Sequence, residues 1–279
     1  MTYTVNGLSL SGGATFYTGN ALGSTASTVT PSTTAAMTVG PSSYGSPYWS
    51  NFAAPNCYNF PTLNSGSTTA DYNYITIAAN SAYSMGRKEY TVEWFQYQTN
   101  YYNYGVYFWT GTGTAPTGFY PSAWGMYASS GYPGPTPPTT NAQITLNEPG
   151  FHPIASAVSP ATMHNAWRHF AIVRSYDSGL WSSALYIDGV FQGENSPTAP
   201  WDMNISGQKI FFGSSDSYDW WWQFSGSMTG FRLTIGKAVY TGNFTKPWGP
   251  LAQTQSANPY GGVNTAPINS GECVLLLNP

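Results

Sequence analysis

The chain has 279 residues, of which 7% are charged and 17% are aromatic, and its formal net charge is −3. Ordinary soluble domains carry about 25% charged residues, so neutral Ser, Thr, Asn, Gln and Tyr side chains must cover this surface. Nucleic acids and anionic membranes attract clustered Lys and Arg. The basic residues here are few and scattered, which argues against both kinds of partner.

Residues 1–55 have the composition of an extended arm. They are rich in Ser, Thr, Gly and Ala, and such segments bury little apolar surface. Short alternating pieces at residues 3–5 and 14–17 could add strands by pairing with another element or with another subunit. The first residues contain no basic and apolar leader, and no later stretch reaches about 18 uninterrupted apolar residues. We therefore expect neither a secretion signal nor a membrane anchor.

Residues 56–279 repeat short stretches of β-branched and aromatic residues that are separated by turn residues. This spacing predicts one large all-β domain. The predicted strands lie, in chain order, at residues 74–77, 90–97, 105–109, 124–127, 167–174, 184–187, 190–191, 209–213, 226–234 and 273–277. Asp188 and Gly189 predict a type I′ turn between two strands, and the proline-rich residues 131–138 predict a surface loop.

Five stretches stand out by their order along the chain: residues 90–94, 167–174, 185–189, 224–234 and 236–247. In this order they resemble the laminin G-like, concanavalin A-like jelly-roll family, in the form common among bacteriophage structural proteins. The resemblance implies a two-sheet antiparallel jelly-roll sandwich, and it implies function only loosely, because this fold hosts lectins, adhesins, hydrolases and capsid appendages. Relatives often carry acidic residues where this chain has Thr229 and Gly230, so no cation-binding role is implied at these two positions.

Carboxylates and histidines do not form a recognisable catalytic pattern. Glycoside hydrolysis on this fold needs two carboxylates close together, whereas Glu89 and Glu93 would lie about 13 Å apart along an extended strand. We therefore expect Glu93 to be a structural residue. His152, His164 and His169 have no Cys, acidic pair or second His at metal-ligand spacing, so zinc is not expected. His169 lies within a predicted strand and is expected to be packed or hydrogen-bonded. The chain is not expected to be an enzyme.

Calcium is the one cofactor that the sequence leaves open. A calcium site needs several oxygen ligands that converge from loops, and the candidates are Asp177, Asp202, Asp216 and Asp219. Asp216 and Asp219 form the best pair because they share one short polar segment. A polar turn without metal explains the same residues, since Asp and Ser are ordinary turn formers.

The aromatic excess is the feature that most suggests a ligand. Sugars stack their apolar faces on Trp and Tyr while polar side chains take the hydroxyls. The candidate glycan-binding residues are Asp219, Trp220, Trp221 and Trp222 in one stretch and Tyr101, Tyr102 and Tyr104 in another. Packing in the core or at a subunit interface is the competing interpretation, because successive strand residues face opposite ways and aromatic residues also dominate interfaces.

The two cysteines, Cys57 and Cys273, are too few for a zinc cluster or a disulfide scaffold. We expect both to be small buried apolar residues. A bond between them stays open, because each lies near one end of the predicted sandwich.

These features together favour a protein that binds and assembles. A sheet protein so short of charge is poorly protected against contact between its edges and patches, which favours a homo-oligomer. The leading hypothesis is a virion structural protein, such as a capsid decoration, tail or fibre component, whose residues 1–55 contact other virion subunits and whose residues 56–279 form a sandwich for cell-surface glycans. The alternative is an extracellular carbohydrate-binding or adhesive module of a microbe. A glycoside hydrolase is the weaker alternative.

Overall fold

The computed structural model describes a subset of the chain, and every structural statement below concerns that subset. The described residues are 3–5, 8–10, 15–18, 29–31, 38–49, 52, 55–60, 75–77, 79–99, 104–111, 125–129, 142–147, 151–158, 163–196, 202–205, 207–213 and 224–278. In several of the strands, among them most of residues 125–129, 142–147 and 151–158, only the backbone path is described.

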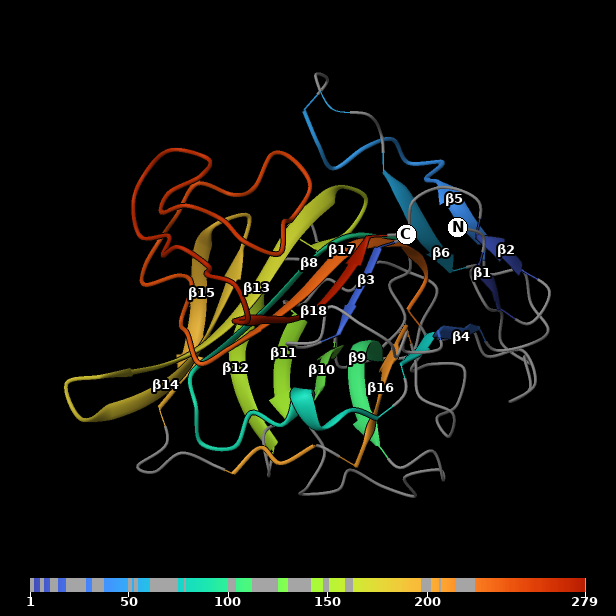
Figure 1. Cartoon of the computed structure of the whole chain (residues 1–279). Coiled ribbons are helices and arrows are strands. Elements are labelled where there is room, and N and C mark those ends of the chain that lie inside the picture. The colour runs from blue at the N-terminus through green and yellow to red at the C-terminus, as the bar shows by residue number, and fades with distance from the viewer. Residues whose placement is uncertain are drawn as a thin grey trace.

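Two large antiparallel sheets form the body of the described structure (Figure 1). The first, called here the β9 sheet, contains in spatial order β12 (Phe151–Val158), β11 (Ala142–Asn147), β10 (Gly125–Ser129), β9 (Tyr104–Gly111), β16 (Lys209–Phe212), β7 (Ile75–Ile77) and β4 (Val29–Pro31). The second, called the β8 sheet, contains β15 (Val190–Asn195), β14 (Leu180–Ile187), β13 (Trp167–Asp177), β8 (Tyr90–Gln98), β17 (Gly226–Ile235), β18 (Cys273–Asn278) and β3 (Thr15–Thr18). The expected all-β, two-sheet antiparallel sandwich is confirmed.

Smaller elements complete the fold. β6 (Asn56–Phe60) pairs with one end of β17, and β5 (Thr38–Pro41) pairs with β6. β1 (Tyr3–Val5) and β2 (Leu8–Leu10) form a hairpin, and η2 (Ser81–Tyr83) is a short 3-10 turn. Within the described residues, no helix is both long and apolar enough to cross a bilayer.

The main core lies between the sheets and follows the alternation of strand residues. On β8, Val92 and Trp94 face the β9 sheet, while Glu93 and Phe95 face the other way, as period-two side-chain geometry requires. The Trp94 ring stacks on Phe170 of the same sheet with centroids 5.4 Å apart and meets Phe108 of the opposite sheet edge-on at 5.6 Å. Aromatic packing therefore joins the two layers, which explains part of the aromatic excess without any ligand.

The outer face of the β8 sheet carries a second core. It is covered by residues 236–272, which we call the cap, and by residues 41–49 and 52. Figure 1 shows the cap as orange and red loops over β13 and β15, on the side away from the β9 sheet. The cap side chains Val239, Tyr240 and Phe244 pack with Phe95 and Tyr186 of the sheet, and all five are buried. This second layer of packing was not predicted from the sequence.

The turn between β14 and β15 has the predicted form. Asp188 and Gly189 have φ angles of 51° and 79°, which are the left-handed values that a type I′ turn requires. A Cβ atom at Gly189 would overlap the backbone carbonyl oxygen of Phe244 in the cap, and the Phe244 N–H donates to the Gly189 carbonyl at 2.9 Å. The glycine is thus needed for close approach of the cap as well as for the turn.

Strands from the predicted arm join this chain's own sheets. β3 pairs with β18 at one edge of the β8 sheet, and β4 pairs with β7 at one edge of the β9 sheet. The alternating pieces at residues 3–5 and 14–17 coincide with strands β1 and β3. A division of the chain at residue 55 and a role of residues 1–55 in assembly stay predictions.

Cys57 and Cys273 are both buried and are not bonded to each other. Burial raises the pKa of Cys57 to about 12 and the pKa of Cys273 to about 11. The expectation of two small buried residues is confirmed.

Candidate functional site

The residues predicted to bind a glycan or calcium lie almost entirely outside the described part of the chain. These are Asp216, Asp219, Trp220, Trp221, Trp222, Tyr101 and Tyr102, while Tyr104 begins β9 without a described side chain. Asp177 and Asp202 are described, and both are exposed. Among the described residues, no three His, Cys, Asp or Glu side chains come together as a metal site would need.

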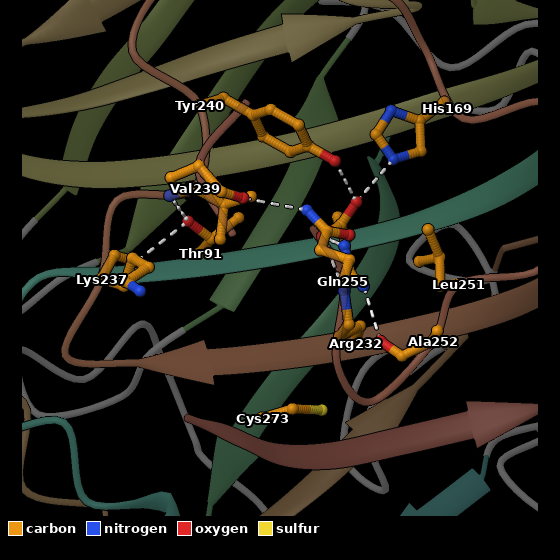
Figure 2. A network of polar contacts seen from close by, with 12 residues as sticks. Thr91, His169, Arg232, Lys237, Val239, Tyr240, Leu251, Ala252, Gln255 and Cys273 are labelled. Carbon is orange, nitrogen blue, oxygen red and sulfur yellow. Dashed lines mark hydrogen bonds and ion pairs between the residues drawn. The ribbon is translucent and has the colours of Figure 1, made fainter. Parts of the chain in front are cut away.

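A buried cluster of polar side chains lies between the β8 sheet and the cap. Glu93 of β8 faces Arg232 of β17, and Glu93 Oε1 accepts hydrogen bonds from Arg232 Nε at 2.9 Å and Nη2 at 2.6 Å. Glu93 Oε2 lies 2.9 Å from His169 Nε2 of β13 and accepts from the Tyr240 hydroxyl of the cap at 2.7 Å. Figure 2 shows His169, Arg232 and Tyr240 converging from different elements. All four side chains are buried.

The charge state of this cluster follows from its contacts. Burial alone would raise the pKa of Glu93, but the Arg232 guanidinium and the hydrogen bonds from His169 and Tyr240 outweigh it and lower that pKa to about 2. Burial beside the carboxylate raises the pKa of Tyr240 well above its usual value. At neutral pH, Glu93 is therefore ionised, Tyr240 keeps its proton, and every side of the carboxylate is occupied. As expected of a structural residue, Glu93 is buried and both of its oxygens have partners.

The same cluster fastens the cap to the sheet. Arg232 Nη1 donates to the carbonyl oxygen of Ala252 at 2.7 Å, so the arginine reaches the cap as well as Glu93. Nearby, Thr91 Oγ1 accepts from the Val239 N–H at 2.9 Å and donates to the Lys237 carbonyl at 3.2 Å. These buried polar groups of the sheet are thus paired with cap atoms, which holds the outer layer in one position.

Asp188 provides a second anchor at the edge of the cap. Its carboxylate bonds to Arg168 Nη1 at 2.9 Å and to Lys246 Nζ at 3.1 Å, and it accepts from the His169 N–H at 3.0 Å. Burial alone would raise the pKa of Asp188, but these contacts lower it overall. The residue predicted only as a turn former therefore also joins the β14–β15 hairpin to the cap.

Aromatic rings gather on the surface beside the cap, in two groups. In the first, Tyr44 stacks on Tyr97 of β8 with centroids 4.3 Å apart and ring planes 4° apart. Trp167 of β13 meets Tyr97 edge-on at 6.0 Å, and Trp167 Nε1 donates to the Gly45 carbonyl at 3.1 Å. Tyr44 is 42% exposed, so one end of this stack faces solvent.

In the second group, Trp49 stacks on Trp248 of the cap, with centroids 5.1 Å apart and ring planes 16° apart. Trp248 also contacts Phe52 at 5.4 Å and Tyr260 at 5.4 Å. The backbone fixes this arrangement, because the Trp49 N–H donates to the Trp248 carbonyl at 3.0 Å and the Phe52 N–H donates to the Trp49 carbonyl at 2.9 Å. Trp49 is nevertheless 60% exposed.

Tyr48 joins the second group to the core beneath it. It is buried, and its ring meets both Phe95 of β8 and Phe52 edge-on, at 5.4 Å and 6.5 Å. We call the surface rings the aromatic rim; its members are Tyr44, Trp49, Tyr97, Trp167, Trp248 and Tyr260. A rim of ordered, partly exposed rings is the kind of surface on which sugars and other ligands stack. The sequence interpretation centred on the Trp220–Trp222 triplet and did not consider Trp49.

No protein-family model and no curated protein matches this sequence. Solved structures do resemble the fold. The enzymatically active domain of tailspike protein 2 from bacteriophage CBA120 matches with a TM-score of 0.50 at 11% identity, over 94% of this chain and 34% of that chain. At this identity, the comparison shows a similar fold and nothing more.

Two further structures match less well. Domain 4 of AbnA, a GH43 extracellular arabinanase from Geobacillus stearothermophilus, has a TM-score of 0.44 at 12% identity and covers 84% of this chain and 85% of that one. A heptameric SAP-like pentraxin from Limulus polyphemus has a TM-score of 0.43 at 12% identity and covers 79% of this chain and 94% of that one. Such identities carry no functional assignment, because one fold serves many functions.

Proposed function

We propose that this chain is a virion structural protein that presents a glycan-binding β-sandwich, and that it acts by binding rather than by catalysis. The observation that carries the proposal is the aromatic rim, above all Trp49, which stays 60% exposed although its backbone and ring are held in place. A large exposed aromatic surface costs free energy unless something covers it. Sugars cover such rings with their apolar faces.

Rigidity supports the same proposal. The rim residues belong to the cap, to residues 41–49 and to strands β8 and β13. The cap is fastened to the β8 sheet by the cluster around Glu93 and by Asp188. Binding to a surface that is already ordered loses little conformational entropy. Stacking on aromatic rings requires no cofactor; calcium bound near Asp216 and Asp219 is a separate proposal.

The virion part of the proposal rests on composition and on fold. With only 7% charged residues, the surface lacks the repulsion that keeps β proteins apart, which suits a homo-oligomer and close contact with other virion subunits. The fold resemblance to a bacteriophage tailspike domain is compatible with this role. An extracellular carbohydrate-binding or adhesive module of a microbe would use the same surface in the same way.

The test has two parts. The purified chain is applied to an immobilised panel of bacterial and plant polysaccharides, and reducing-sugar release is measured on every polysaccharide that it binds. We expect binding without release; release of reducing ends would show catalysis and sink the binding-only proposal. Purified virions from the source material are then searched for the chain by mass spectrometry. Its absence from virions together with its presence in the culture medium would favour the microbial module.

A further inference from the structure

We infer that the stacked pair Trp49 and Trp248 is the glycan-binding site, and that the glycan it takes is uncharged. The inference rests on the proposed function and deepens it, since it names both the place and the chemical class of the ligand.

The indole pair is built like a binding platform. The two nearly parallel rings, 16° apart, stack on each other, so one face of Trp49 rests on Trp248 while Trp49 stays 60% exposed to solvent. Trp248 also packs against Phe52 and Tyr260, with ring centroids 5.4 Å away in each case, so its ring is held in place on the cap. Trp49 is therefore presented to solvent in a fixed orientation, which is what stacking against a sugar ring needs.

The charge around the platform selects the ligand class. Residues 41–55 and 247–271, which supply Trp49 and Trp248, contain no Asp, Glu, Lys, Arg or His. The nearest basic residue along the chain, Lys246, bonds to Asp188 at 3.1 Å. Arg232 and Glu93 act electrostatically on Tyr260, but both are fully buried and paired with each other. A carboxylate of a sialic or uronic acid would therefore lose its hydration here without gaining a charged partner. A neutral sugar has no such cost.

Polar groups for sugar hydroxyls are present at the edge of the platform. The Tyr260 hydroxyl donates to the Pro250 carbonyl at 3.3 Å, and its oxygen keeps lone pairs that can accept from a sugar. Burial raises the pKa of Tyr260 to about 12, so the hydroxyl stays neutral over the physiological range. The platform thus combines an apolar face with an uncharged hydrogen-bonding group, as glycan sites do.

A second aromatic pair in this chain supplies a matched control. Tyr176 and Trp181 on the β13–β14 hairpin lie 4.9 Å apart, and Tyr176 is 53% exposed. That pair has charged neighbours, because the Arg174 guanidinium lies 5.1 Å from the Trp181 ring and the Glu89 carboxylate accepts from the Tyr176 N–H at 3.0 Å. The exposure of Tyr176 is similar to that of Trp49, whereas its ring is tilted by 37° against Trp181 and its charge environment differs.

The experiment compares the whole chain, Trp49→Ala, Trp49→Phe and Tyr176→Ala by native affinity electrophoresis. The gels contain either neutral polysaccharides (dextran, galactomannan, arabinan) or acidic ones (alginate, polygalacturonate). We expect at least one neutral polysaccharide to retard the wild type and Tyr176→Ala equally. Trp49→Ala should bind about tenfold more weakly, a loss equal to about 1.4 kcal/mol, and Trp49→Phe should recover part of it. Retardation should not change between about 0.05 and about 0.5 M NaCl, because no ion pair is involved.

Three outcomes would overturn the inference, and they are distinguishable from one another. Undiminished binding by Trp49→Ala would move the site elsewhere and leave the proposed function standing. Preference for the acidic polysaccharides would leave the site standing and refute the ligand class. No retardation of the wild type in any gel, together with loss of self-association in Trp49→Ala by analytical ultracentrifugation, would remove both the inference and the glycan-binding function. Because Trp49 is largely exposed, circular dichroism should confirm that all variants fold.

Discussion

Glu93 and Arg232 face each other on neighbouring strands, and a single oxygen, Glu93 Oε1, accepts from both Nε at 2.9 Å and Nη2 at 2.6 Å. Neither side chain is exposed. A buried pair of this kind gains little over two apolar residues, but breaking it leaves one charge without a partner. The pair therefore makes the attachment of the cap sensitive to single substitutions.

The first prediction concerns this pair. Arg232→Met should lower the free energy of unfolding by about 3–5 kcal/mol, because the Glu93 carboxylate is left buried without its main counter-charge. The double variant Glu93→Gln/Arg232→Met should lose less than Arg232→Met alone. Urea unfolding followed by tryptophan fluorescence measures both. With Glu93→Gln measured as the second single variant, a double variant that loses as much as the two single variants together would show that the two residues are not coupled.

The second prediction is an acid dependence. The pKa values of Glu93 and Asp188 are lower in the folded chain than in the unfolded chain, so both groups contribute stability that is complete above their ordinary pKa values. For Glu93 that contribution falls away as the pH drops from about 4.5 towards about 2. Midpoints of urea unfolding, measured from pH 7 down to pH 2, should be flat at first and then fall. In Glu93→Gln, the fall of the midpoint at low pH should be smaller than in the wild type. A fall of the same size would contradict the lowered pKa of Glu93.

The third prediction separates the cap from the sandwich. Tyr240→Phe removes one hydroxyl that donates to Glu93 and keeps the ring that stacks on Phe244 with centroids 3.6 Å apart. The lost bond goes to a charged acceptor, so we expect a cost of about 1.5–3 kcal/mol. Hydrogen exchange, read by mass spectrometry, should accelerate in peptides from residues 236–272 and stay unchanged in β9. Uniform acceleration would mean that the cap and the sandwich unfold together.

The fourth prediction uses two glycines in equivalent hairpin turns. Gly179 and Gly189 have φ angles of 87° and 79°, so alanine at either position costs about 1–2 kcal/mol of backbone strain. Open space surrounds Gly179, whereas a Cβ at Gly189 overlaps the Phe244 carbonyl. Gly189→Ala should therefore cost a further ~1–3 kcal/mol through displacement of the cap. Equal losses in thermal unfolding would show that the cap does not press on this turn.

Much of the fold could be predicted from the sequence because most strands alternate or carry an unmistakable turn. The stretch from Trp167 to Phe191 is the best example: its strands and its Asp188–Gly189 turn all appear in the structure. β11 and β12 were not predicted. In β11, residues 143–146 (Gln-Ile-Thr-Leu) do alternate between polar and apolar side chains. In β12, His152 and Pro153 interrupt the alternation and obscure the strand pattern.

The cap and the rim could not be predicted for a different reason. Glu93, His169 and Arg232 lie on three strands that are far apart in sequence, and only the order β13, β8, β17 within one sheet brings them together. Trp49 stands in a Ser-, Gly- and Pro-rich segment without alternation, so nothing local shows that it stacks on a ring almost two hundred residues later. The available signal was weaker: residues 41–55 are rich in aromatic residues, and both they and residues 247–271, which contain Trp248, are entirely without charge.

The two sulfhydryl groups allow one more conclusion. Cys57 and Cys273 are enclosed and unjoined, and almost none of either is deprotonated near neutrality, because their pKa values are raised to about 12 and about 11. Thiol exchange needs the thiolate and access to it, so both sulfurs resist glutathione and oxidants alike. The chain should therefore keep both cysteines as free thiols, whether it is made in a reducing cytoplasm or exposed to air. Transfer between the two environments should cause no disulfide exchange.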